Sequence, residues 1–156
     1  MTIALGVFAL AVVAIVGILP QLMRQAAASN ELLVAQRFPD AVRSEMRRVA
    51  TGSFDSFAAS IPVNSAATGG YQILATRDGA RISSAATNDG VLNETEAFFS
   101  IELWRFSDPP LAFVPGQTGS LAVLVRVSWP YRLPGSVAST DLEDRQQFSF
   151  ATAINR

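Results

Sequence analysis

The chain has 156 residues, of which 49% are hydrophobic and 16% are charged, and its formal net charge is −1. It has no cysteine or histidine, and all twelve basic residues are arginine. These absences exclude a thiolate nucleophile, a Ser-His-Asp triad, a P-loop lysine and a zinc site of the usual nitrogen and sulfur type. We expect no enzyme and no cofactor, and neither a nucleic acid nor a small-molecule substrate as partner.

The chain opens on an apolar run, Thr2 to Met23, that carries no charge before Arg24. As a helix this run would span roughly 33 Å, about the hydrocarbon thickness of a bilayer. A cleaved signal peptide is the competing interpretation, since an A-x-A-like site ends at Ala28, but no basic region precedes the run and its apolar core is unusually long. The run predicts a single-pass membrane anchor, kinked at Pro20.

The run also places small residues on one helical stripe, Gly6, Ala9 and Gly17, together with Val13. Such a stripe permits close contact between helices, although small residues are also simply common in membrane spans. Arg24 follows the run, and by the positive-inside rule it would keep the remaining chain in the cytoplasm. We therefore expect a basic leader upstream of Met1, which would place the head in the periplasm.

An amphipathic helix is predicted after the apolar run. Apolar residues recur close to a 3.6-residue period at Phe38, Val42, Met46 and Val49, and this stripe is expected to pack on a sheet. Pro39 predicts either one kinked helix reaching about residue 50 or two helices divided at Phe38. Residues 51–53 end the helix, which sets the expected division into a helical segment, 1–52, and a globular head, 53–156.

The remaining chain is typical of strands separated by turns. Residues 71–77 and 80–84 flank Asp78-Gly79, a pair suited to a two-residue hairpin turn. Segments 98–106, 121–131 and 145–155 are also strand-like, the first and last of them alternating clearly. The expected fold is α+β: an antiparallel meander of four or five strands, covered on one face by the amphipathic helix.

This order of elements resembles the type IV pilin superfamily. The run "TIALGVFALAVVAIVGILP" is similar to the segment that follows the leader-peptidase site in that family, and "ILATRDGARI", "FFSIELWR", "VRVSWPYRLPG" and "QFSFATAINR" resemble the Verru_Chthon cassette group of pilin-like proteins. The resemblance covers essentially the whole chain. It implies a structural, minor subunit of a type IV pilus-like or type II secretion pseudopilus-like filament. The implied partners are membrane lipid, other pilin-like subunits and an inner-membrane assembly machinery.

The start of the chain departs from the family pattern. The family places a Gly-Phe processing site and a Glu just before the hydrophobic run, and Met1-Thr2-Ile3 contains neither. Two alternatives stay open: the start is truncated, or the protein is an anchored relative that does not polymerise.

Other polar and aromatic groups of the sequence are candidate ligand sites. Asp141, Glu143 and Asp144 are weak calcium candidates, and a capped surface turn explains them equally well. Trp104 and Trp129 could join Tyr131 in a sugar-binding platform, but sealing the sheet–helix core is the favoured interpretation. The alternative function is a membrane-tethered extracytoplasmic module that binds a surface glycan or protein through loops near 86–96 and 134–144.

Overall fold

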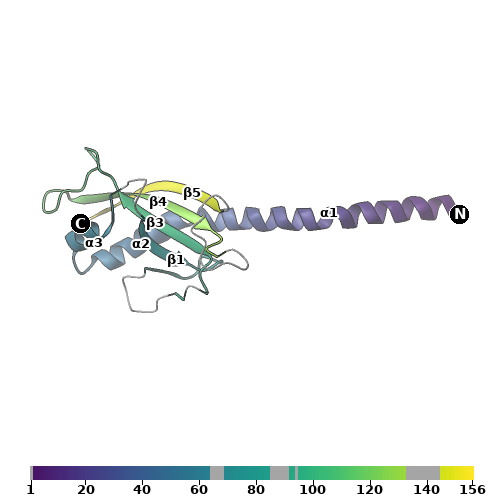
Figure 1. Cartoon of the computed structure of the whole chain (residues 1–156), viewed down its shortest axis with the longest axis horizontal. Helices are drawn as coiled ribbons and strands as arrows, with labels where there is room; N and C mark the ends of the chain where they lie inside the picture. The colour runs from purple at the N-terminus through teal and green to yellow at the C-terminus, as the bar shows by residue number, and fades with distance from the viewer. Residues whose placement is uncertain (1, 64–68, 85–91, 94, 133–144) are drawn as a thin grey trace. The chain divides into compact units, whose positions relative to one another are not determined.

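The computed structural model of the chain describes residues 2–63, 69–84, 92–93, 95–132 and 145–156 (Figure 1). The side chains of residues 2–11 and 14 lie outside this description. The chain divides into two compact units, Met1–Leu33 and Val34–Arg156. We call the second unit the head.

Helix α1, Thr2–Ala35, makes up almost all of the first unit and continues through Pro20. Among the residues described with their side chains, no helix is both long and apolar enough to cross a membrane. The N–H of Arg37 donates to the carbonyl of Val34 at 3.0 Å, and α2, Phe38–Ala50, begins directly afterwards. Of the two expected arrangements, the structure shows the helices divided at Phe38.

Helix α2 ends at Ala50, where expected, and Thr51 caps it, since the Thr51 hydroxyl donates to the carbonyl of Arg47 at 2.9 Å. A short helix that the sequence analysis missed follows it: α3, Phe54–Ser60. Ser53 caps α3, because its hydroxyl oxygen accepts a hydrogen bond from the N–H of Ser56 at 3.4 Å. Both α2 and α3 belong to the head, which begins at Val34. The expected division at residues 52/53 stays a prediction.

The head contains one five-stranded antiparallel sheet with the order β2-β1-β3-β4-β5 (Figure 1). The strands are β1 Tyr71–Ala75, β2 Ile82–Ser84, β3 Phe99–Arg105, β4 Ser120–Trp129 and β5 Gln146–Asn155. The expected meander is wrong in one respect, since β1 pairs with both β2 and β3 and leaves β2 at the edge. The three-residue β2 offers a shorter ladder than β1, so the longer strand takes the inner position.

The hairpin between β1 and β2 also differs from the expected two-residue turn. Thr76 pairs with Arg81 through its N–H at 3.1 Å, which leaves four residues in the loop. Asp78 holds this wider loop, because its carboxylate accepts hydrogen bonds from the Thr76 hydroxyl at 2.5 Å and the Ala80 N–H at 3.0 Å. Gly79 takes the left-handed conformation at φ 69°, as the sequence suggested for that residue.

The core of the head lies between α2 and one face of the sheet. Phe38, Val42 and Met46 of α2 are fully buried there, and Val49 packs against them with part of its surface exposed. Phe38 contacts Phe99 of β3 edge to face, with ring centroids 4.9 Å apart. Every second residue of β4 from Leu121 to Trp129 points into the same core: Leu121, Val123, Val125, Val127 and Trp129.

Candidate functional site

Helix α1 exposes large apolar side chains over its described middle portion. Val13 and Met23 are each 70% exposed in the chain, and six further residues between them or beside them are at least 41% exposed. These are Val12, Ile15, Val16, Ile18, Leu19 and Leu22. Because a helix turns every 3.6 residues, such closely spaced positions point to every side of it. We call this surface the apolar belt.

The predicted stripe of small residues falls partly on the apolar belt. Gly6 and Ala9 have side-chain positions outside the described part, while Val13, Gly17 and Pro20 lie on the belt and are exposed. A methyl group added at Gly17 would meet nothing within 4 Å. The helix surface around Gly17 is therefore open and carries no side chain at this position.

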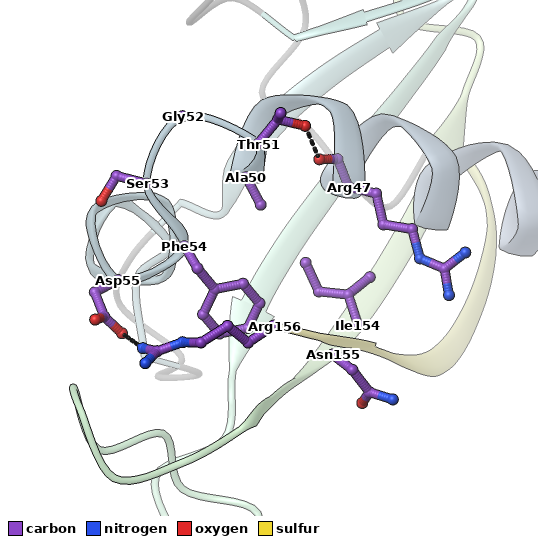
Figure 2. A pocket seen from close by; sticks show the side chains of 10 residues that line it. All are labelled: Arg47, Ala50, Thr51, Gly52, Ser53, Phe54, Asp55, Ile154, Asn155 and Arg156. Carbon is purple, nitrogen blue, oxygen red and sulfur yellow. Dashed lines mark hydrogen bonds and ion pairs between the residues drawn. The ribbon is translucent and has the colours of Figure 1, made fainter.

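The head carries a surface hollow of about 520 Å³ where α2 ends, α3 begins and β5 ends (Figure 2). Its floor is apolar and includes Ala50, Phe54 and Ile154. Its polar rim is built from both ends of the head sequence: Arg47, Thr51, Gly52, Ser53, Asp55, Asn155 and Arg156. The lining therefore combines apolar side chains with two arginine, two hydroxyl-bearing and one carboxylate side chain.

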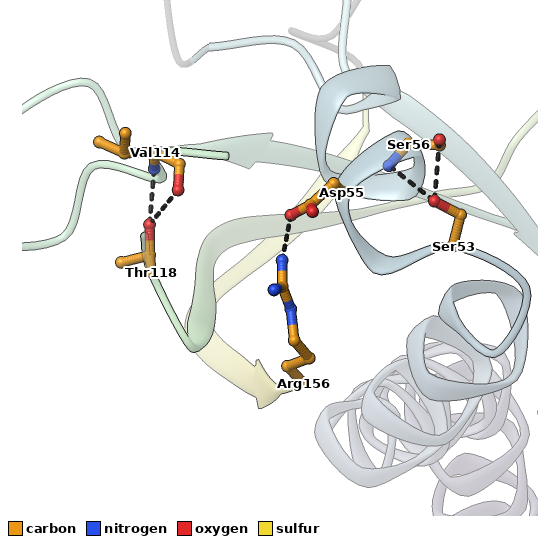
Figure 3. Close-up of polar contacts among 6 residues, drawn as sticks. All are labelled: Ser53, Asp55, Ser56, Val114, Thr118 and Arg156. Carbon is orange, nitrogen blue, oxygen red and sulfur yellow. Dashed lines mark hydrogen bonds and ion pairs between the residues drawn. The ribbon is translucent and has the colours of Figure 1, made fainter. Parts of the chain in front are cut away.

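Arg156 closes one side of this hollow. Its guanidinium pairs with the Asp55 carboxylate (Figure 3) and lies 5.5 Å from the Phe54 ring centroid. Its main-chain N–H donates to the Gly119 carbonyl at 2.8 Å, which continues the β4–β5 ladder. Asp55 therefore neutralises Arg156, and Arg47 supplies the remaining positive charge on the rim.

A second feature of α2 is a buried carboxylate. Glu45 is 5% exposed, and the Arg48 guanidinium donates two hydrogen bonds to it at 2.7 Å each. The Ser84 N–H at the end of β2 donates a third at 3.3 Å. The hydrogen bonds and charge of Arg48, with the N–H of Ser84, lower the pKa of Glu45 below its ordinary value of 4.5 despite its burial. Glu45 thus connects α2 to the edge strand β2.

The candidate ligand sites from the sequence are not brought together in the described residues. Asp141, Glu143 and Asp144 lie outside the description, and no three candidate metal-binding side chains cluster within it. Trp104, Trp129 and Tyr131 are all at least 93% buried, so they form no exposed platform for a sugar. Arg126 covers Trp104, with its guanidinium 4.7 Å from the ring centroid. Trp129 lies in the core between α2 and the sheet, as the favoured interpretation predicted, whereas Trp104 is buried outside that core and Tyr131 packs in a separate cluster with Leu74 and Leu92.

The hollow beside Arg156 escaped sequence reasoning. Asp55 and Arg156 stand 101 positions apart in the chain, and no motif connects them. The only local signal was Ser53 followed by Asp55, which marks the start of a capped helix.

Comparison with known proteins returned no match, since no family model, no curated protein and no solved structure is similar to this chain at a significant level.

Proposed function

We propose that the chain is a pilin-like protein, a minor subunit of a type IV pilus-like or type II secretion pseudopilus-like filament. In this proposal α1 anchors the protein in the bacterial inner membrane and the head faces the periplasm. The observation that carries it is the apolar belt, Val12 to Met23, whose large side chains are exposed in the isolated chain. Leaving such surface in water costs about 25 cal/mol for each Å², so the belt requires a cover.

Lipid and neighbouring helices are the two covers that the proposal invokes. In the membrane, acyl chains would surround the belt. On assembly the belt would leave lipid and pack among the same helices of other subunits, with Gly17 allowing a close approach. Exchanging lipid contact for helix contact has little hydrophobic driving force. Filament growth would therefore depend on an assembly machinery that supplies energy.

The absence of native cysteine makes single-cysteine labelling a direct test. Val16→Cys lies in the apolar belt, and Ala59→Cys places the same thiol at an exposed site on α3. In intact membranes we expect a polar maleimide to label Ala59→Cys readily and Val16→Cys poorly, with equal labelling of both after denaturation. Equal labelling in intact membranes, or recovery of the chain in the soluble fraction, would contradict membrane anchoring.

Oxidative crosslinking separates assembly from anchoring. In filament fractions, Val13→Cys and Gly17→Cys should give covalent dimers and larger species, because neighbouring belts would lie in contact. Ala59→Cys serves as the control for random collision and should remain monomeric. A belt cysteine that is protected from the maleimide yet never crosslinks would agree with membrane anchoring and contradict filament assembly.

The alternative, a tethered module for a surface glycan or protein, stays a prediction. Most of its expected binding loops, 86–96 and 134–144, lie outside the described residues. No described feature favours a glycan, since the three candidate aromatic side chains are buried.

A further inference from the structure

Strand β5 presents an open edge. It pairs with β4 along one side, and within the described residues no strand pairs with its other side. All ten of its residues, Gln146–Asn155, are uncharged. Natural sheets usually protect such a long edge with charged side chains, proline or a bulge, because the unpaired main chain is a template for another strand. The β5 edge shows no charge or proline.

The main-chain direction of this edge follows from one hydrogen bond. The Arg156 N–H donates to the Gly119 carbonyl at 2.8 Å, so the main chain of Arg156 faces β4. Main-chain groups alternate in direction along an antiparallel strand. The N–H and C=O groups of Ser149, Ala151 and Ala153 therefore point toward the open edge, and the side chains of these three residues are exposed.

Two arginine side chains of α2 flank the same edge. Arg43 and Arg47 are one helical turn apart and so share a face of α2. The Arg43 Nε donates to the Thr152 hydroxyl oxygen at 3.3 Å, which places Arg43 directly on β5. Arg47 lines the 520 Å³ hollow together with Ile154 and Asn155 at the end of the strand (Figure 2).

A second hollow lies beside the middle of β5 and reaches over β4. Its volume is about 370 Å³, and it is lined by Arg43 and by three successive residues of β5, Ala151, Thr152 and Ala153, with Phe106, Leu111 and Ala122 beside them. The small side chains of the two alanines leave the main chain of the edge accessible. Two hollows therefore lie next to the second half of β5, one beside its middle and one at its end.

The charge beside this edge is positive. Arg43 forms an ion pair with Asp40 at 3.3 Å. Because this pair is exposed, Asp40 offsets only part of the positive charge of Arg43. The exposed Arg47 side chain forms no ion pair with any residue that the structure describes. Since β5 is uncharged, the two arginine side chains decide which partner the edge prefers.

We propose that the open edge of β5 binds an extended acidic segment of a partner protein, which adds to the sheet as a sixth strand. The outward main-chain groups of β5 would pair with those of the segment. Alternate side chains of the segment would point toward α2, where carboxylates would meet Arg43 and Arg47. A second copy of β5 is a poorer occupant, because it is uncharged and would leave both arginine side chains unmatched. The inference concerns the head alone and does not depend on filament assembly.

Fluorescence anisotropy with the full-length chain in detergent tests this proposal. The probe is a labelled ten-residue peptide with glutamate at alternate positions and valine between them. One control peptide replaces glutamate by lysine, and another keeps every glutamate and replaces the valines by proline, which removes main-chain donors. We expect the Glu–Val peptide to bind at least about tenfold more tightly than either control.

Two substitutions on the protein examine charge and main chain separately. Arg47→Glu should weaken binding of the Glu–Val peptide about fivefold or more, and Ala151→Pro should abolish it by removing an outward N–H and blocking the edge. Arg81→Glu is the matched control, because Arg81 lies beside β2 at the opposite edge of the sheet and its pair with Glu96 is exposed. It should leave binding unchanged.

Several outcomes would overturn the proposal. Equal binding of the Glu–Val and Glu–Pro peptides would mean that only charge matters, and unchanged binding to Arg47→Glu would remove the role of α2. If Ala151→Pro fails to fold, Arg47→Glu and the peptide pair still decide. Sedimentation of the chain without peptide as a dimer that Ala151→Pro converts to monomer would assign the edge to a second copy instead.

Discussion

Arg48 holds the buried carboxylate of Glu45 with two hydrogen bonds of 2.7 Å, three residues away on the same helix. Only the carboxylate is buried, since the Arg48 side chain is 49% exposed. Arg48 thus keeps its charge hydrated while satisfying an acceptor that would be costly to bury alone. The third bond, from the Ser84 N–H, fastens the short edge strand β2 to α2.

Glu45→Gln should lower the free energy of unfolding by about 1–3 kcal/mol at pH 7, because the amide loses a charge-assisted pair and offers only one acceptor oxygen. The difference should depend on pH. The pKa of Glu45 is lower in the folded head than its ordinary value of 4.5, so the pair stabilises the fold fully above that pH. That contribution is lost as the pH falls through the folded-state pKa. Urea titrations of the unsubstituted chain and of Glu45→Gln between pH 7 and pH 3 measure this loss of stability.

The control for this prediction is Glu96→Gln, which removes a carboxylate that is 48% exposed and pairs with Arg81. Its effect should be small at every pH. A Glu45→Gln effect that stays constant down to pH 3 would contradict the assigned role of the carboxylate.

Two ion pairs of the head should differ in strength. Arg126 pairs with Glu102 at 2.6 Å across β3 and β4, both side chains are less than 30% exposed, and Arg126 also covers the Trp104 ring. Arg81 and Glu96 are joined at 3.1 Å, with both side chains about half exposed. Double-mutant cycles on the free energy of unfolding should give a coupling of about 1 kcal/mol for the first pair and close to zero for the second. Equal couplings would show that burial and ring contact add nothing.

Adjacent glycine residues before β1 offer a matched comparison. A methyl group at Gly70 would lie 2.8 Å from the Glu102 Cβ and 2.9 Å from Trp104, whereas one at Gly69 would meet nothing within 4 Å. Gly70→Ala should therefore destabilise the head by about 1–3 kcal/mol through overpacking, and Gly69→Ala should change its stability by no more than about 0.5 kcal/mol. Thermal unfolding followed by tryptophan fluorescence tests both. A Gly70→Ala variant as stable as Gly69→Ala would mean that Trp104 can move aside freely.

Periodicity explains how much of this fold was predictable. The spacing of Phe38, Val42 and Met46 identified the buried face of α2, and alternation identified β5, because in these two elements burial follows the period of the backbone. Alternation in the sequence also located β3, although this strand is buried on both faces. Non-local choices were not readable in this way. The inner place of β1 in the sheet depends on competition between partners, and the hairpin loop depends on the Asp78 side chain.

The hollows on the head were beyond reach for a related reason. In the larger one, Arg156 at the end of β5 pairs with Asp55 of α3. Helix α3 has seven residues and is too short to show a helical period of apolar residues in the sequence. The open edge of β5 likewise depends on strand order. The same sequence pattern would be expected for a strand in the middle of a sheet, so the pattern does not reveal that β5 is an edge strand. The chemistry of these sites was visible in the residues, but their neighbours were not.

The core of the head should be most sensitive to a change at Met46, because the Met46 side chain of α2 is fully buried against the sheet. Met46→Ala should lower the free energy of unfolding by about 2–5 kcal/mol, since it removes apolar contacts and leaves a cavity that the packed strands fill only in part. Leu33→Ala, at a residue of α1 that is 57% exposed, is the control and should cost no more than about 0.5 kcal/mol in detergent. Urea unfolding monitored by the fluorescence of the two buried tryptophan residues, Trp104 and Trp129, measures both effects. If Leu33→Ala were as damaging as Met46→Ala, the head would not be stabilised by its own core, and treating α2 as the cover of the sheet would be wrong.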